Sequence, residues 1–436
     1  MKKIAILGNM NNNGFSLLRY FRDLGFNADL LLFKNDVEKN VTDFTLEADT
    51  WYLEKWVKYI KYLPAVNGYG QALSKSSINK ILLYIVYYLR KAMHSKNALY
   101  AKPASKRDLN KLKHTISGYD IIIGSGATPA ILYSINYKLD LFFPYSQGIE
   151  FLYEDYFFHY RKSKFPLVKY IAHQMFKMQE KGIIQSKVCL TVNEELTNQA
   201  YKKIGVNPKT GAVPIVYPYE IADSNSFSNG LKKTLEFLLG YDYLLISHGR
   251  HLWKKPQNFT SDQWELLTKN NNWIIEAYKR FLLDRPKSNS VLIFFEYGED
   301  FEESKLLCDQ EKLSKNVIWL PKMKRKEIFE VLKYCSVGLG EFYQSESFFG
   351  GCGWEIISNG LPLIHGYKRD IDSFQIDYGY TAPPFYIANS IDSIHAGLIE
   401  FYDNKKYRLK IGEDSKAWFN SNNGHQGIKN ILKFIK

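Results

Sequence analysis

The sequence predicts an α/β protein with two domains, each a parallel sheet covered by helices. Short apolar runs alternate with amphipathic segments, and this alternation occurs once in each half of the chain. The length of 436 residues exceeds what one hydrophobic core usually organises. Between the halves, residues 219–233 are polar and have the composition of an interdomain linker.

The first half opens with a βαβ unit. Residues 3–7 are expected to form a strand, residues 16–24 a helix that Gly25 ends, and residues 28–33 the next strand. Such a unit implies a parallel sheet with helices on its faces. Later strands are expected at residues 120–123, 141–144 and 188–192, and the unit is expected to close near residues 213–216.

The second half repeats the alternation. Strands are expected at residues 243–247, 290–295, 317–320 and 337–339, and helices at residues 273–283, 303–312 and 326–334. We therefore predict domains at residues 1–218 and 234–412, joined by the linker at 219–233, with a C-terminal helix in 413–436 that packs back on the first domain. Ligands of such sheets bind at the carboxyl ends of the strands, so the site is expected between the domains.

Residues 341–364 carry the most informative pattern. Two acids, Glu346 and Glu355, flank an aromatic, glycine-rich turn that contains Gly350 and Gly351. The turn is expected to lead into a short helix that has Glu355 in its early turns. A helix N-terminus offers free N–H donors to an anion, and carboxylates accept hydrogen bonds from hydroxyl groups. A ligand that carries both phosphate and sugar hydroxyls fits this pattern.

A second pattern follows the predicted strand at 243–247. Gly249 and Arg250 stand at the end of this strand, and Lys255 lies six residues after the glycine. An arginine can hold a diphosphate with two hydrogen bonds, and a lysine can hold it as a point charge. The alternative interpretation is a solvated basic loop, which a lysine-rich chain often has.

Together the two patterns resemble the signature of retaining GT-B glycosyltransferases, in particular glycosyltransferase family four (glycosyl transferases group 1). The resemblance covers residues 243–365 well and the first half only in its general pattern. The positions that match in register are Glu355, Gly360, Pro362, Leu363 and Ile364. Glu346 and Glu355 are separated by eight residues, one more than is usual in the family, and the extra residue is placed at 347–349.

The resemblance implies a role for each matched residue. Arg250 and Lys255 would stabilise the departing nucleoside diphosphate, Glu346 would orient the donor sugar, and Glu355 would hold the ribose hydroxyls. The anomeric configuration would be retained, with the departing diphosphate taking the acceptor proton. Further donor contacts are expected from Tyr297, Lys322, Met323, Phe349, Gly350 and Gly351.

Three residues of the first half are candidates on the donor or acceptor side. Gly14 would face the donor phosphate, although a plain turn glycine explains it equally well. Gln147 and Glu150 follow a predicted strand where the family often has a histidine–glycine pair near the transferred sugar. Gln147 could hydrogen-bond a sugar hydroxyl but could not titrate, which argues against a histidine-assisted mechanism.

No motif indicates a cofactor or a metal. Residues 8–14 lack the glycine spacing of a dinucleotide site. The four cysteines are scattered, which favours a reducing compartment, and Asp370 and Asp372 are interpreted as part of a solvated loop. We therefore expect neither a cofactor nor a metal, only a nucleoside-diphosphate sugar as donor substrate.

The net charge of +13 is concentrated in two stretches. Residues 80–113 contain nine Lys/Arg and one acid, and residues 161–187 contain seven Lys/Arg and one acid. The apolar, tyrosine-rich run at 81–89 has the composition of an interfacial membrane helix, but a core helix or a nucleic-acid patch would also fit. No nucleic-acid motif supports the last of these, so an anionic membrane surface is the expected partner and nucleic acid is not.

The expected location is the cytoplasm, at the cytoplasmic face of the membrane when bound to it. The N-terminus lacks the long apolar run of a signal peptide, and no run approaches the roughly 20 residues of a transmembrane helix. The predicted function is transfer of a sugar, of the hexosyltransferase type, to a hydroxyl of a glycan or lipid-linked saccharide in cell-surface polysaccharide biosynthesis. The alternatives are a nucleotide-sugar epimerase or phosphorylase on the same fold, and a non-catalytic basic binding protein.

Overall fold

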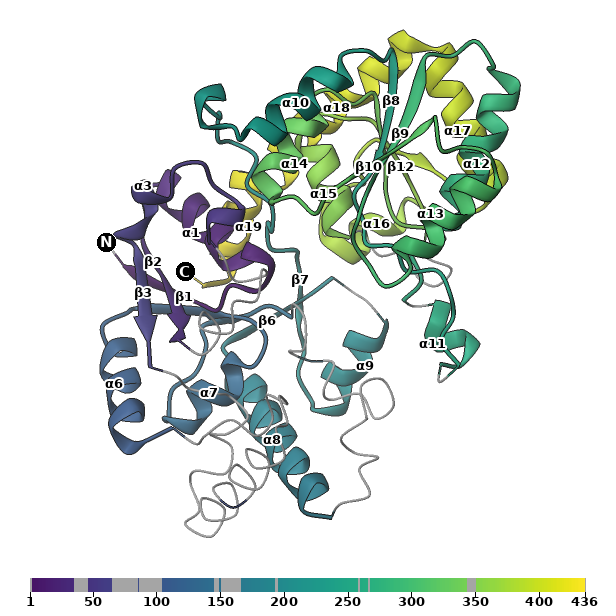
Figure 1. Ribbon diagram of the computed structural model, residues 1–436. Coiled ribbons are helices and arrows are strands. Elements are labelled where there is room, and N and C mark those ends of the chain that lie inside the picture. The colour runs from purple at the N-terminus through teal and green to yellow at the C-terminus, as the bar shows by residue number, and fades with distance from the viewer. Residues whose placement is uncertain are drawn as a thin grey trace.

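The computed structural model describes residues 2–34, 46–64, 85, 104–144, 149, 166–192, 195–257, 259–265, 267–342 and 350–435. These residues form two parallel sheets, each covered by helices (Figure 1). The predicted α/β class with two Rossmann-like sheets is confirmed. Among the residues described, no helix is long and apolar enough to cross a membrane.

The first sheet has seven strands in the order β3-β2-β1-β4-β5-β6-β7. They are β1 (Lys3–Leu7), β2 (Asn27–Phe33), β3 (Ile60–Leu63), β4 (Ile121–Gly124), β5 (Leu141–Phe142), β6 (Val188–Thr191) and β7 (Lys209–Thr210). All pairs are parallel, and Ile4 on β1 lies between Ala28 on β2 and Ile121 on β4.

Two parts of this sheet differ from the prediction. The edge strand β3 was not predicted, because Lys61 and Tyr62 interrupt its apolar residues and only Ile60 and Leu63 are buried. The sheet also ends at Thr210, before the expected closing segment at 213–216. That segment contains Pro214, which has no N–H to donate to a neighbouring strand.

Helices cover both faces of the first sheet. They are α1 (Asn13–Asp23), α3 (Leu53–Val57), α6 (Lys106–Ile116), α7 (Thr128–Ser134), α8 (Pro166–Gln185) and α9 (Glu195–Lys203), with short 3-10 helices η1 (Met10–Asn12) and η3 (Leu46–Ala48). Helix α1 begins three residues earlier than expected. The side-chain oxygen of Asn9 accepts the N–H of Phe15 at 2.8 Å, which satisfies one free donor of its first turn.

The second sheet has six strands in the order β10-β9-β8-β11-β12-β13. They are β8 (Tyr243–Ser247), β9 (Ser290–Phe295), β10 (Val317–Leu320), β11 (Val337–Leu339), β12 (Leu363–His365) and β13 (Tyr386–Ile387). The bounds of β8, β9, β10 and β11 coincide with the predicted ones. Every residue of β8 and β9 is buried, as is typical of strands covered on both faces.

The helices around the second sheet are α10 (Asn229–Leu238), α11 (Ser261–Glu265), α12 (Asn271–Asp284), α13 (Phe301–Gln310), α14 (Arg325–Leu332), α15 (Gly351–Ser358), α16 (Ser373–Tyr378), α17 (Ile391–Asp403) and α18 (Lys405–Asn422). Part of the stretch expected as a linker is helical. It contains the 3-10 helix η6 (Ser224–Ser226) and the start of α10, where the Ser228 hydroxyl accepts the N–H of Leu231 at 3.1 Å.

The last helix, α19 (Gly424–Ile435), lies against α1 of the first half (Figure 1). Ile428, Ile431 and Leu432 belong to the same buried cluster as Ile4 and Ile6 of β1. The C-terminus of the chain thus completes the core of the domain that its N-terminus begins.

Candidate functional site

Helix α15 begins at a turn where Gly350 lies tightly against the side chain of Glu341. A Cβ added to Gly350 would lie 2.1 Å from Oε2 of Glu341, far inside contact distance. Gly351 is the first residue of the helix, and nothing lies within 4 Å of the position of its Cβ. The first backbone N–H groups of a helix have no partner within the helix, so this end of α15 can bind an anion.

The end of α15 also follows the predicted pattern. The helix stops at Ser358, and Gly360 has a positive φ of 77°, which favours glycine at this position. Pro362 then precedes β12, which lies beside β11 in the sheet. The sequence pattern of helix, glycine stop and apolar strand is therefore present as expected.

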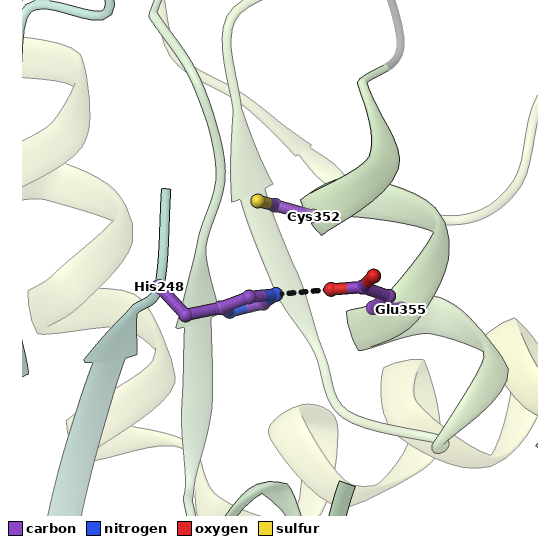
Figure 2. Close-up of side chains that lie close together, drawn as sticks. All are labelled: His248, Cys352 and Glu355. Carbon is purple, nitrogen blue, oxygen red and sulfur yellow. Dashed lines mark hydrogen bonds and ion pairs between the residues drawn. The ribbon is translucent and has the colours of Figure 1, made fainter. Parts of the chain in front are cut away.

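Glu355 is buried in the middle of α15, where Figure 2 shows its hydrogen bond with His248, and both of its carboxylate oxygens have a partner. Its Oε2 accepts a hydrogen bond from Nε2 of His248 at 2.7 Å, and its Oε1 accepts one from Nε of Arg325 at 2.6 Å. Burial raises the pKa of Glu355, but the charges of Arg325 and His248 and their hydrogen bonds outweigh burial and lower the pKa below its ordinary value. Glu355 is therefore a carboxylate at neutral pH.

His248 follows β8 directly and is buried against α15. Burial alone would lower the pKa of His248, but interactions with Cys352 and Glu355 outweigh it and raise the pKa to about 10. The imidazole is therefore protonated at neutral pH. His248 was not predicted as a site residue, because its partners on α15 lie about a hundred residues away in the sequence.

Among the residues described, His248, Cys352 and Glu355 form a group of side chains that could hold a metal ion. Each offers one ligand atom, and these atoms lie within 4.8 Å of one another (Figure 2). Imidazole, thiolate and carboxylate are a ligand set that suits Zn²⁺. However, Arg325 already occupies one oxygen of Glu355, so the contacts seen here satisfy the carboxylate without an ion.

Arg325 links this site to the first domain. It is the first residue of α14, and its Nη1 donates to the backbone oxygen of Asn11 at 2.9 Å. The same Nη1 lies 3.6 Å from Oδ1 of Asp49. Lys322 and Met323 of this loop were predicted as site residues and Arg325 was not, since nothing in the neighbouring sequence marks it as a partner of Glu355.

Glu341 joins the two sequence motifs in space. It follows β11, and its Oε1 lies 2.7 Å from Nζ of Lys269. A Cβ on Gly249 would lie 3.9 Å from both this oxygen and Sγ of Cys352. The glycine turn after β8 and the N-terminus of α15 are therefore neighbours.

Of the two predicted cations, Arg250 adjoins this turn and Lys255 lies farther along the loop, against α11. Nη1 of Arg250 is 3.7 Å from Oε1 of Glu299, and 40% of its side chain is exposed. Nζ of Lys255 donates to Oγ of Ser261, the first residue of α11, at 3.0 Å. Neither side chain is buried.

Two of the expected donor contacts are brought together. Nζ of Lys322 lies 4.8 Å from the ring centroid of Tyr297. The backbone oxygen of Tyr297 accepts the N–H of His251 at 2.8 Å, which ties the loop after β9 to the loop after β8. Met323, beside Lys322, packs against the apolar core of the second domain.

Gly14 lies in the first turn of α1 and is buried. A Cβ there would be 2.1 Å from the backbone oxygen of Gly8, so this glycine allows α1 to pack closely on the end of β1. That contact gives Gly14 a packing role, and its place opposite a donor phosphate stays a prediction. The remaining candidates, Glu346, Phe349, Gln147 and Glu150, lie outside the described residues.

No family model matches the chain, and no curated protein is similar to it in sequence. Solved structures do share its fold. HepE of Anabaena, solved with UDP, has a TM-score of 0.58 at 12% identity and covers 99% of both chains. Trehalose-6-phosphate synthase OtsA has a TM-score of 0.57 at 11% identity over 99% of this chain and 98% of that chain.

TarM of S. aureus, solved with UDP and α-GlcNAc-glycerol among its ligands, has a TM-score of 0.54 at 10% identity over 100% of both chains. These likenesses extend over the whole chain and include both sheets. The chain therefore has the GT-B fold of these proteins, as predicted. Membership of glycosyltransferase family four stays a prediction.

Proposed function

We propose that this protein is a retaining GT-B glycosyltransferase that moves a sugar from a nucleoside-diphosphate sugar to a hydroxyl of a glycan or lipid-linked saccharide. One observation carries the proposal. The Gly249–Arg250 turn lies against the N-terminus of α15, so a cation and free backbone donors meet where the carboxyl ends of β8 and β11 lie side by side.

In this proposal the diphosphate binds at the N-terminus of α15. The turn at Gly350 and Gly351 lets a phosphate approach the backbone closely, and the helix dipole favours its negative charge. Arg250 and Lys255 turn toward the phosphates and stabilise the charge that develops as the sugar leaves. The diphosphate takes the proton of the acceptor hydroxyl, so no separate enzymic base is needed.

Glu355 is proposed to hold the ribose. A carboxylate has about four acceptor positions, and His248 and Arg325 occupy two of them. The remaining positions can accept the ribose hydroxyls. Tyr297, Lys322 and Met323 are proposed to surround the base, and Glu346 to orient the transferred sugar.

The structural neighbours support a nucleotide-sugar donor. HepE is solved with UDP and with UDP-glucose, and TarM with UDP and a saccharide ligand. We propose cell-surface polysaccharide synthesis as the pathway, at the cytoplasmic face of an anionic membrane. The exposed cations of α6 provide the surface for that contact, whereas the run at 81–89 lies outside the described residues apart from Ile85.

Thermal-shift titration with a panel of UDP-, GDP- and other nucleotide sugars tests the proposal. At least one of them should raise the melting temperature, and the bound one should be hydrolysed slowly when no acceptor is present. A protein that binds none of them would overturn the proposal and favour a non-catalytic binding role. If the donor is not hydrolysed but the configuration at one ring carbon of its sugar is inverted, the result would instead indicate an epimerase.

A further inference from the structure

Arg325 contacts both domains with one guanidinium group. Its Nε bonds Glu355 at 2.6 Å in the second domain, and its Nη1 bonds the backbone oxygen of Asn11 at 2.9 Å in the first. Only 17% of its side chain is exposed. The guanidinium of Arg325 thus holds the β1–α1 loop, which contains Asn11, together with Glu355, the carboxylate proposed to bind the ribose.

Asp49 supplies the charge on the first-domain side. Its carboxylate is fully buried, forms an ion pair with Nη2 of Arg19, and lies 3.6 Å from Nη1 of Arg325. Nη1 of Arg19 also donates to the backbone oxygen of Asp49 at 2.9 Å. The position of Asp49 is therefore fixed by α1, and Arg325 lies between two buried carboxylates, Asp49 and Glu355.

Residues beside Arg325 and Asp49 make further contacts between the N-terminus of α14 and residues 49–51. Nζ of Lys326 donates to the backbone oxygen of Thr50 at 3.0 Å and lies 4.4 Å from the ring centroid of Trp51. Trp51 in turn contacts Phe227 with ring centroids 5.1 Å apart. The N-terminus of α14 therefore rests on residues 49–51, and a movement between the domains would change the surroundings of Arg325.

Glu355 has two charged partners, Arg325 and His248, and loss of either makes a buried carboxylate less favourable. The position and the charge of Glu355 therefore depend in part on Arg325. Arg325 in turn depends on Asp49 and Asn11. We propose that Arg325 is a positioning residue that presents Glu355 to the ribose only while the first domain is docked against α14, so that donor affinity in the second domain depends on the contact with Asp49. This inference rests on the proposed function and adds an interdomain coupling to it.

Calorimetry with UDP and GDP on the full chain tests the coupling. Arg325→Gln and Asp49→Asn should each weaken binding of the preferred diphosphate about 5- to 150-fold, the usual range of coupling between sites. Asp49→Asn should add little in the Arg325→Gln background, because Asp49 acts through Arg325. Lys324→Gln, one residue away on an exposed side chain, removes the same charge and should bind like the wild type.

Two readouts separate positioning from a structural role. Arg325→Lys keeps the charge and should restore part of the affinity. In Arg325→Gln the pKa of Glu355 should rise, because the guanidinium no longer lowers it and His248 alone offsets burial. Diphosphate affinity should therefore begin to fall at a higher pH than in the wild type when the pH is lowered. The wild type and Lys324→Gln should keep their affinity to a lower pH, until protonation of Asp49, whose pKa is raised by burial, weakens its contact with Arg325.

The outcomes are distinct. If Asp49→Asn unfolds the chain, the affinities and pH profiles of the Arg325 variants still test whether Arg325 positions Glu355. Wild-type affinity and pH profile in Arg325→Gln, or additive effects of the two substitutions, would overturn the inference alone. A wild type that binds no nucleoside diphosphate would overturn the proposed function and this inference with it.

Discussion

At the residue scale, Arg250 is the side chain on which turnover should depend most. It is 40% exposed and makes one long contact, at 3.7 Å to Glu299, so its removal should barely change the melting temperature. Loss of one positioned charge stabiliser typically lowers turnover about a hundredfold or more. We expect that loss in Arg250→Ala and not in Lys254→Ala, which removes a nearby cation paired with Glu303. A near-normal rate in Arg250→Ala would refute its role.

His248 should make stability depend on pH. Its folded pKa of about 10 lies above its ordinary value of 6.5, because Cys352 and Glu355 outweigh its burial. Its contribution is therefore complete below pH 6.5 and is lost as the pH rises through 10. Over this interval the free energy of unfolding of the wild type should fall relative to His248→Asn, by at most about 1.4 kcal/mol per pH unit. Urea denaturation measures both, and parallel pH profiles would contradict the assignment.

The contacts of Glu355 predict that catalysis needs no metal. His248 and Arg325 each donate to one of its oxygens, so both oxygens have a positively charged partner without an ion. Extended dialysis against EDTA should leave the transfer rate unchanged, and the purified protein should contain no stoichiometric metal by mass spectrometry. If EDTA lowers the transfer rate and zinc restores it in the wild type but not in Cys352→Ser, catalysis depends on a metal at this site.

At the element scale, the start of α15 can be tested by two neighbouring glycines. An alanine at Gly350 would place its Cβ 2.1 Å from Glu341, whose carboxylate Lys269 holds at 2.7 Å. Forcing a methyl into such a contact costs about 1–3 kcal/mol and should displace the anion-binding turn. Gly351→Ala has open space around its Cβ and should unfold at the same urea concentration as the wild type. If the two variants are equally stable, the Glu341 side chain moves aside at little cost and position 350 does not require glycine.

The sequence predicted elements well where burial on both faces leaves a continuous apolar run. The bounds of β8, β9 and β11 were predicted correctly for this reason. Those of the edge strand β10 were also correct, because Val317–Leu320 are all apolar although β10 has only one neighbour. The edge strands β3 and β7 were missed, because edge positions tolerate the polar residues Lys61 and Lys209, which remove that signal. Patterning along the chain thus identifies the centre of each sheet better than its edges.

The candidate site could be predicted only where its residues are close in the sequence. The turn before Glu355 and the strand end at Arg250 each form a local pattern. His248 and Arg325 carry no such pattern, since each becomes a partner of Glu355 only when β8, α14 and α15 are assembled. The two charged partners of Glu355 can therefore be recognised only in the folded structure.

At the scale of the whole molecule, the distribution of positive charge predicts where it meets a membrane. Helix α6 of the first domain has exposed cations at Lys106, Arg107, Lys111 and Lys113, and its acid Asp108 is engaged in capping the helix at Ser105. Each Lys or Arg near an anionic bilayer contributes about 1 kcal/mol before screening. We expect the protein to sediment with vesicles that contain acidic lipid, and less so as salt rises, since exposed charges are screened over about 8–10 Å.

Glutamine at all four α6 positions should therefore release the protein from acidic vesicles while donor hydrolysis continues. The matched control makes the same change of charge on the second domain, with glutamine at Lys232, Lys233, Lys405 and Lys406, all exposed. If net charge alone drove binding, both variants would be released equally, because they lose the same charge. Release of the α6 variant only would place the membrane contact on the domain proposed to receive the acceptor. Sedimentation that ignores lipid charge would argue for a soluble acceptor instead.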